Sequence, residues 1–112
     1  MTDCLFCKMV AGDIKPDIVY ENDRLLAFRD INPQAPVHVL VIPKVHIATL
    51  NDLDNVELAG ELLGAVKAIA LQEGLAQNGY RTGINCNANG GQDVYHLHMH
   101  ILGGRQMKWP PG

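Results

Sequence analysis

The chain has 112 residues, a net charge of −3 and 47% hydrophobic residues, which predicts one compact domain over residues 1–112 and is too short for two. The charge balance and the lack of a Lys/Arg run argue against a nucleic-acid-binding protein. No apolar run is long enough to cross a membrane, and no signal peptide is visible. Three cysteines, an odd number, fit a reducing compartment, so a cytoplasmic protein is expected.

The hydrophobic pattern predicts two helices and five strands. In chain order these are a short helix, a β-hairpin, a strand, a long helix and two strands, at residues 5–10, 18–21 and 25–29, 37–42, 52–74, 80–86 and 96–102. Thr2 and Asp3 are expected to cap the short helix, and Gly12 to end it. Tight turns between consecutive strands favour an antiparallel sheet, so the predicted class is α+β, with the long helix packed on one face of a five-stranded sheet.

Two glycines, Gly60 and Gly64, interrupt the long helix one turn apart. Each costs roughly 1 kcal/mol relative to alanine in a helix interior. Either another backbone packs closely against that face, or the glycines are merely tolerated.

Three of the five histidines alternate with apolar residues near the end of the chain. On a strand, His96, His98 and His100 would share one face, about 6.6 Å apart, and the apolar residues between them would point into the core. A histidine can attack phosphorus and form a covalent intermediate if its other ring nitrogen keeps the proton, usually by donating to a backbone carbonyl. His98, with a histidine on either side, is the best-placed nucleophile. The alternatives are a surface strand without function and a single catalytic metal bound by all three histidines.

Two further features suit a phosphate site. His38 lies in an otherwise apolar predicted strand, where a lone histidine is more often a satisfied core residue, unless the neighbouring strand carries the three histidines. The loop 89–93 contains two glycines and offers backbone N–H groups, together with the Gln92 amide, to phosphate oxygens.

A metal site is also predicted. Cys4 and Cys7 have the spacing of zinc ligands, and His46 and His96 are available to complete a closed Cys₂His₂ tetrahedron. Such a zinc ion would tie the N-terminal helix to the sheet and would assign His96 to structure. Cys86 is expected to lie in a strand as a small buried side chain.

At this point the chain resembles the histidine triad family, in the branch of histidine-triad nucleotide-binding proteins. The resemblance is carried by His96-Leu97-His98-Met99-His100-Ile101-Leu102, and it extends over residues 28–36, His38, 41–44, 90–92, Tyr95 and 103–112. It implies a HIT-like fold in a homodimer whose two sheets form one ten-stranded sheet, joined along the long helix and a strand edge.

The resemblance also implies an activity and a set of roles. The activity is purine nucleoside phosphoramidase: hydrolysis of the P–N bond of AMP or GMP phosphoramidates, including lysyl-AMP-type adducts, with no cofactor for catalysis. His98 would form a nucleotidyl-histidine, His100 would contact the phosphate and help the leaving group, and His38 would support the triad. The remaining implied positions are Asn85, Gly91, Gln92 and Asp93 at the phosphate, Asp30 at the ribose, Leu5, Phe6, Met9, Phe28 and Ile31 at the base, and Trp109, reaching the leaving-group side of the other subunit's site.

Two features differ from the animal members of this branch. Asp93 stands where they commonly have serine, and the complete set of two cysteines and two histidines is one that they lack. Alternative activities are hydrolysis of dinucleoside polyphosphates or nucleotidyl transfer within the same superfamily. A third alternative is a nucleotide-binding interaction protein whose turnover is incidental.

Overall fold

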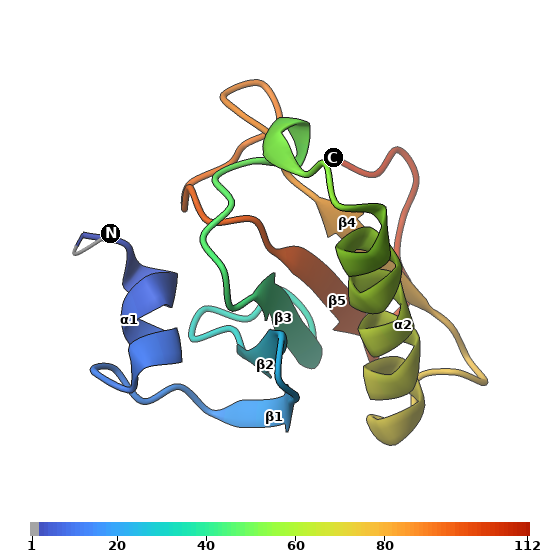
Figure 1. Ribbon diagram of the computed structural model, residues 1–112. Coiled ribbons are helices and arrows are strands. Elements are labelled where there is room, and N and C mark those ends of the chain that lie inside the picture. Colours follow the sequence, from blue (N-terminus) through green and yellow to red (C-terminus); the bar gives the residue numbers. More distant parts are fainter. Residues whose placement is uncertain (1–2) are drawn as a thin grey trace.

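The computed structural model describes residues 3–112, whose five strands form one antiparallel sheet with a helix on each face (Figure 1). The elements are α1 (Leu5–Ala11), β1 (Ile18–Glu21), β2 (Leu25–Arg29), β3 (Val37–Pro43), a 3-10 turn η1 (Leu50–Asp52), α2 (Val56–Gln72), β4 (Tyr80–Ile84) and β5 (Met99–Gly103). The strand order is β1-β2-β3-β5-β4. The predicted α+β class and five-stranded antiparallel sheet are therefore confirmed.

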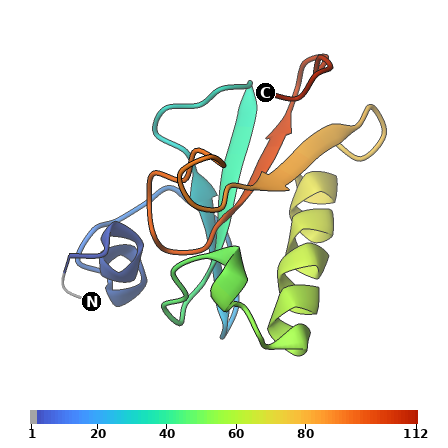
Figure 2. The same cartoon turned by 90° about the horizontal axis from the view of Figure 1, so that it is seen from above.

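The two-residue period of the strands divides the core into two parts. On the face covered by α2, alternate residues of β2, β3 and β5 pack together with the buried side of the helix; these strand residues are Leu25, Ala27, Val39, Val41, Met99 and Ile101. On the opposite face, Leu26, Phe28, Leu40 and Ile42 pack against Phe6 of α1. Figure 2 shows the two helices on opposite sides of the sheet. The smaller layer under α1 leaves room for a site on that face.

The long helix begins four residues later than predicted. Thr49 and Asp52 form a capping box that closes the turn η1, and Leu53 then adopts an extended conformation. The helix proper starts after Asn55, whose side chain accepts a hydrogen bond from the N–H of Leu58. Two separate capping residues, Thr49 for η1 and Asn55 for α2, therefore move the start of the long helix from the predicted residue 52 to Val56. No helix within residues 3–112 is both long and apolar enough to cross a membrane.

The predicted cap of α1 is wrong. Cys4 is the N-cap, and its sulfur accepts a hydrogen bond from the N–H of Cys7 at 3.3 Å, so Asp3 lies outside the helix. Thr2 lies outside the described residues. Gly12 ends the helix with φ +86°, as predicted.

The last strand begins at Met99, so His96 and His98 precede it, contrary to the prediction of one strand over 96–102. The register pairs Val41 with Met99, so continuing the ladder would bring Pro43 opposite Leu97, and proline has no N–H to donate. The N–H of Leu97 bonds instead to the carbonyl of Ile47 at 2.6 Å. The alternation nevertheless persists, because Leu97 is buried in the α2 core with Met99.

The fourth strand ends at Ile84, so Cys86 follows the strand rather than lying in it, and it is half-buried rather than buried. The turn after it folds back closely, since a Cβ on Gly90 would lie 2.5 Å from the carbonyl oxygen of Cys86. This turn carries the chain toward the three histidines.

Candidate active site and metal centre

A pocket of about 690 Å³ opens on the α1 face of the sheet. Its walls include most of the residues that the resemblance assigned to a nucleotide: Leu5, Phe6, Met9, Phe28, Asp30, Ile31, Asp93, His98 and His100. Residues far apart in the chain are brought together because α1 and the ends of β2 and β5 meet on this face. The wall combines apolar and aromatic side chains with two imidazoles and carboxylates, which suits a ligand that has both a flat apolar ring and polar groups.

The ring of His98 has a defined proton position. Its Nδ1 lies 2.8 Å from the carbonyl oxygen of His96, and a carbonyl can only accept, so Nδ1 carries the hydrogen. Nε2 of neutral His98 therefore keeps a free lone pair, which is the state that a nucleophile requires. Phe6 packs edge-on against this ring, with centroids 5.3 Å apart and planes at 90°. The sequence-based expectation of a backbone carbonyl acceptor is met.

A chain of hydrogen bonds fixes the proton of His100. The backbone N–H of Gln34 donates to Nδ1 of His38 at 3.0 Å, so in neutral His38 the hydrogen lies on Nε2. That nitrogen is 2.9 Å from Nδ1 of His100, which must then accept, and neutral His100 carries its hydrogen on Nε2. His100 thus offers an N–H while His98, with ring centroids 5.1 Å away, offers a lone pair.

Burial favours the neutral form of His100 and His38 by lowering the pKa of each. Burial, with the charges of His98 and His38, lowers the pKa of His100 to about 4. Burial also lowers the pKa of His38, although the Asp30 carboxylate, 3.5 Å from its Nε2, acts in the opposite direction. His38 is therefore not an isolated core histidine, because β3 pairs directly with β5.

The glycine loop is arranged differently from expectation. The N–H groups of Gly91 and Gln92 donate to Ala88 and Asn87 within the loop. The Gln92 side chain is buried, and its amide bonds to Asn87, Ala48 and Val94. Asn85, Gly91 and Gln92 do not line the pocket. Their role at the phosphate stays a prediction, and the structure gives Gln92 a part in holding the loop together.

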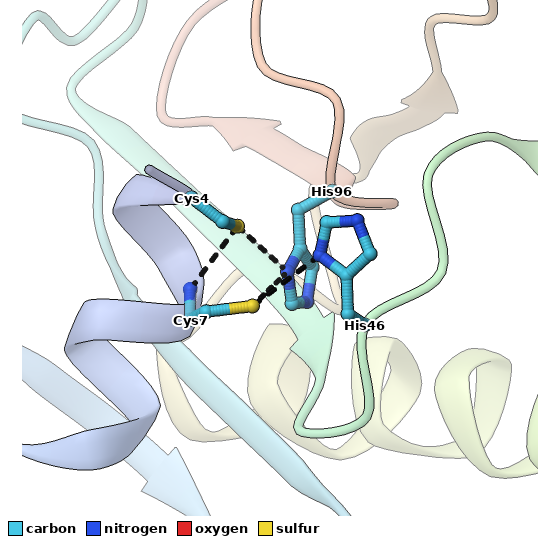
Figure 3. A group of neighbouring side chains, drawn as sticks. All are labelled: Cys4, Cys7, His46 and His96. Atoms are coloured by element: carbon cyan, nitrogen blue, oxygen red, sulfur yellow. Dashed lines mark hydrogen bonds between the residues drawn. The ribbon is translucent and has the colours of Figure 1, made fainter. Parts of the chain in front are cut away.

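The four predicted metal ligands meet at one end of α1, as Figure 3 shows. Their ligand atoms all lie within 4.8 Å of one another. Cys4 Sγ is 3.3 Å from His96 Nδ1, and Cys7 Sγ is 3.3 Å from His46 Nδ1 and 3.5 Å from His96 Nδ1. Tetrahedral zinc with ordinary Zn–S and Zn–N bonds requires sulfur–nitrogen separations of about 3.6 Å. Both the donor set and the spacing therefore fit zinc.

Proton positions also suit a metal. Nε2 of His96 donates to the carbonyl of Pro43 at 2.8 Å, so Nδ1 turns its lone pair toward the two sulfurs. Burial lowers the pKa of His96, which keeps the ring neutral. Burial and the neighbouring Cys4 raise the pKa of the Cys7 thiol, so metal binding would have to displace its proton.

One catalytic metal shared by all three histidines does not fit this arrangement. The ring of His96 is directed to the cysteines, and among residues 3–112 the other ligand cluster contains Asp30, His38 and His100 without His98. In that cluster, the lone pair of His100 Nδ1 already receives the N–H of His38.

Several residues of the pocket wall were missed by sequence reasoning: Ile14, Lys15, Pro16, Asp17, Arg29, Asn32, Leu40 and Val94. Leu40 was accessible to prediction, because it alternates with His38 on the same face of β3. The stretch 14–17 carries no periodic signal. Trp109 is 81% exposed and does not line the pocket of its own chain.

The chain is similar to known proteins in both sequence and structure. The HIT domain family matches residues 11–107. The chain is 47% identical to the purine nucleoside phosphoramidase of Escherichia coli K12, covering 94% of this chain and 90% of that protein. It is 49% identical to the 14 kDa zinc-binding protein of Zea mays, covering 96% and 87% respectively. A crystal structure of a HIT family hydrolase from Legionella pneumophila superposes with a TM-score of 0.95, at 54% identity, covering 98% of this chain and all of the other. Together with the paired histidines of β3 and β5, these matches establish that the chain belongs to the HIT domain family of hydrolases.

Proposed function

We propose that this protein is a purine nucleoside phosphoramidase that cleaves the P–N bond of AMP or GMP phosphoramidates through His98. The observation that carries the proposal is the hydrogen bond from His98 Nδ1 to the His96 carbonyl, which leaves Nε2 free at a pocket of about 690 Å³. The activity named for the Escherichia coli relative supports the same reaction class.

In the first step, Nε2 of His98 forms a bond to phosphorus while the P–N bond breaks. The leaving amine takes the bonding electron pair and a proton supplied by solvent water, and the nucleotide remains on His98. In the second step, water attacks phosphorus, releases the nucleoside monophosphate and gives up a proton, so the protons balance over the cycle. The neutral His100 ring would donate its Nε2–H to the phosphate group, and His38 keeps that ring in the required tautomer.

The rest of the pocket would hold the nucleoside. Phe6 and Phe28, with centroids 5.3 Å apart, would pack against the base with Leu5, Met9 and Ile31, and Asp30 would accept from the ribose hydroxyls. Asp93, exposed at the pocket wall near His100, would meet the leaving group. We assign Asn85, Gly91 and Gln92 to the loop that borders the phosphate.

We further propose that Cys4, Cys7, His46 and His96 hold a structural zinc ion. Zinc would supply folding free energy by joining α1 to the segments that follow β3 and precede β5. Two neighbouring thiols that must stay reduced suit the cytoplasm, which is the compartment we propose.

A homodimer completes the proposal. Val56, Leu63 and Leu71 of α2 are 84%, 58% and 70% exposed, and β4 is an edge strand of the sheet. A Cβ on Gly60 or Gly64 would meet nothing within 4 Å, so a second chain could approach this helix closely. In such a dimer the two sheets would continue as ten strands, and the exposed Trp109 would reach the site of the partner. In analytical ultracentrifugation we expect the wild-type protein to sediment as a dimer and the Leu63→Glu variant to sediment as a monomer.

The reaction is tested with AMP joined to tryptamine or lysine, with release of AMP as the readout. We expect turnover by the wild-type protein, its loss in His98→Ala, and a nucleotidyl adduct on His98 in acid-quenched samples examined by mass spectrometry. Absence of AMP release from any phosphoramidate would refute the proposal. The same panel includes a dinucleoside tetraphosphate, whose faster hydrolysis would favour the alternative hydrolase activity, and activity that survives in His98→Ala would exclude the covalent route.

A further inference from the structure

The metal cluster and the nucleotide pocket share parts of the chain. Phe6 lies between the two cysteine ligands in sequence, and it is 4% exposed. Its ring contacts His98 on the pocket side and His96 on the cluster side, with centroid separations of 5.3 and 5.8 Å. The same short helix therefore supplies two metal ligands and part of the wall beside the nucleophile.

This helix is held on the sheet mainly by Phe6, with the half-buried Met9 and Val10 packed beside it. It is seven residues long, and Phe6 is its one buried residue, while an isolated helix of this length is unstable in water. Figure 1 shows α1 beside the sheet, on the opposite side from α2, and its packing on the sheet is centred on Phe6. Leu5 and Met9 of the same helix also line the pocket, so displacement of α1 would remove three wall residues at once.

His96 makes a second connection. Its Nδ1 faces the cysteines, its Nε2 donates to the carbonyl of Pro43, and its own carbonyl oxygen accepts from Nδ1 of His98. A ring held at both nitrogens fixes the orientation of the residue whose carbonyl sets the tautomer of His98. Without the metal, Nδ1 of His96 would lose its bond, and only the Nε2 hydrogen bond to Pro43 would orient the ring.

We propose that metal occupancy of the Cys4–Cys7–His46–His96 cluster controls nucleotide binding, with Phe6 as the positioning residue that transmits it. The inference rests on the proposed nucleotide site. Because coupling between two ligands is reciprocal, AMP must raise the affinity for zinc by the factor by which zinc raises the affinity for AMP.

The test measures AMP binding by calorimetry on zinc-loaded protein and on protein stripped by a chelator. We expect about tenfold weaker binding without the metal, and a similar gain in zinc affinity, measured against a chromophoric chelator, when AMP is present. Equal AMP affinity in the two forms overturns the inference. Phosphoramidate hydrolysis is assayed separately, so a protein that binds AMP but fails to cleave the substrate refutes the proposed function and leaves the coupling measurable.

A thermodynamic cycle tests whether Phe6 carries the coupling between the metal cluster and the AMP site. Phe6→Ala should weaken AMP binding to the zinc-loaded protein. Removal of the metal should then reduce the AMP affinity of this variant by a smaller factor than it reduces that of the wild type. Val10→Ala is the matched control, since Val10 lies on the same helix and packs in the same layer but does not line the pocket. An undiminished metal effect in Phe6→Ala excludes Phe6 as the transmitter.

Circular dichroism checks that the stripped protein keeps its fold. If the stripped protein unfolds, the cluster is loaded with cobalt(II) instead, and AMP is added to this folded form. The visible absorption bands of cobalt(II) report the geometry of its ligands. AMP is expected to shift these bands in the wild type and to shift them less in Phe6→Ala. Bands that do not respond to AMP in the wild type overturn the inference.

Discussion

The lowered pKa of His100 makes protein stability depend on pH in a window that can be calculated. The pKa is about 4 in the folded protein, against 6.5 for an unperturbed histidine, because the ring is buried beside His98 and His38. Between these values the unfolded chain binds a proton that the folded chain does not. Stability from this residue is therefore complete above the unfolded pKa and falls as the pH drops through 6.5 toward 4.

The magnitude follows from the two values. Lowering the pH from 7 to 5 should reduce the free energy of unfolding by about 2 kcal/mol through His100, out of about 3 kcal/mol once the pH is below both pKa values. The substitution His100→Gln removes the titration and keeps a neutral side chain of polar character. We expect the variant to lose about 2 kcal/mol less than the wild type over this interval.

Urea denaturation at pH 7 and pH 5 measures the difference, with equal protein concentration and metal content in both proteins. His38, His96 and Cys7, whose pKa values are also perturbed, remain in both proteins, so the difference reports His100 together with the change that its loss causes in its hydrogen-bond partner His38. Identical pH dependence in the two proteins would show that His100 is not protonated at a lowered pKa. A steeper loss in the variant would contradict the sign of the argument.

Three other changes test separate parts of the site. His98→Ala should reduce phosphoramidate turnover by at least about 10³-fold while AMP affinity, measured by calorimetry, changes only severalfold. Cys4→Ser should lower the zinc content by metal analysis and lower the thermal midpoint, whereas Cys86→Ser, a cysteine outside the cluster, should leave the zinc content unchanged. Asp30→Ala should reduce kcat/KM by roughly tenfold for a ribonucleotide substrate and much less for its 2′,3′-dideoxy analogue, since the lost acceptors serve the ribose hydroxyls.

The central strands could be predicted because their burial depends on local pattern. Residues 37–42 are apolar at nearly every position, and in the sheet β3 is covered on both faces and flanked by β2 and β5. The single polar side chain in that run, His38, has a partner at each ring nitrogen, the N–H of Gln34 and Nδ1 of His100, as a buried imidazole requires.

The features that were missed depend on long-range partners. The start of β5 at Met99 is set by Pro43 on the neighbouring strand, which no inspection of residues 96–102 alone reveals. The cap of α1 was assigned to Thr2 and Asp3 by residue preference, whereas Cys4 takes it in the structure. The wall at Lys15 and Asp17 lies in an irregular connection, whose position is determined by the elements on either side.

Alternation assigned the three histidines to one face but could not assign their chemistry, because identical side chains two residues apart differ only in what their second nitrogen meets. His96 and His98 each donate to a backbone carbonyl, but through different nitrogens, Nε2 and Nδ1. The remaining lone pair therefore points to the cysteines in His96 and lies at the pocket in His98. His100 accepts at Nδ1 instead and so has a hydrogen to offer rather than a lone pair. Exchanging any one of these partners would change which ring nitrogen keeps a lone pair and which carries the hydrogen, although the sequence of the triad stayed the same.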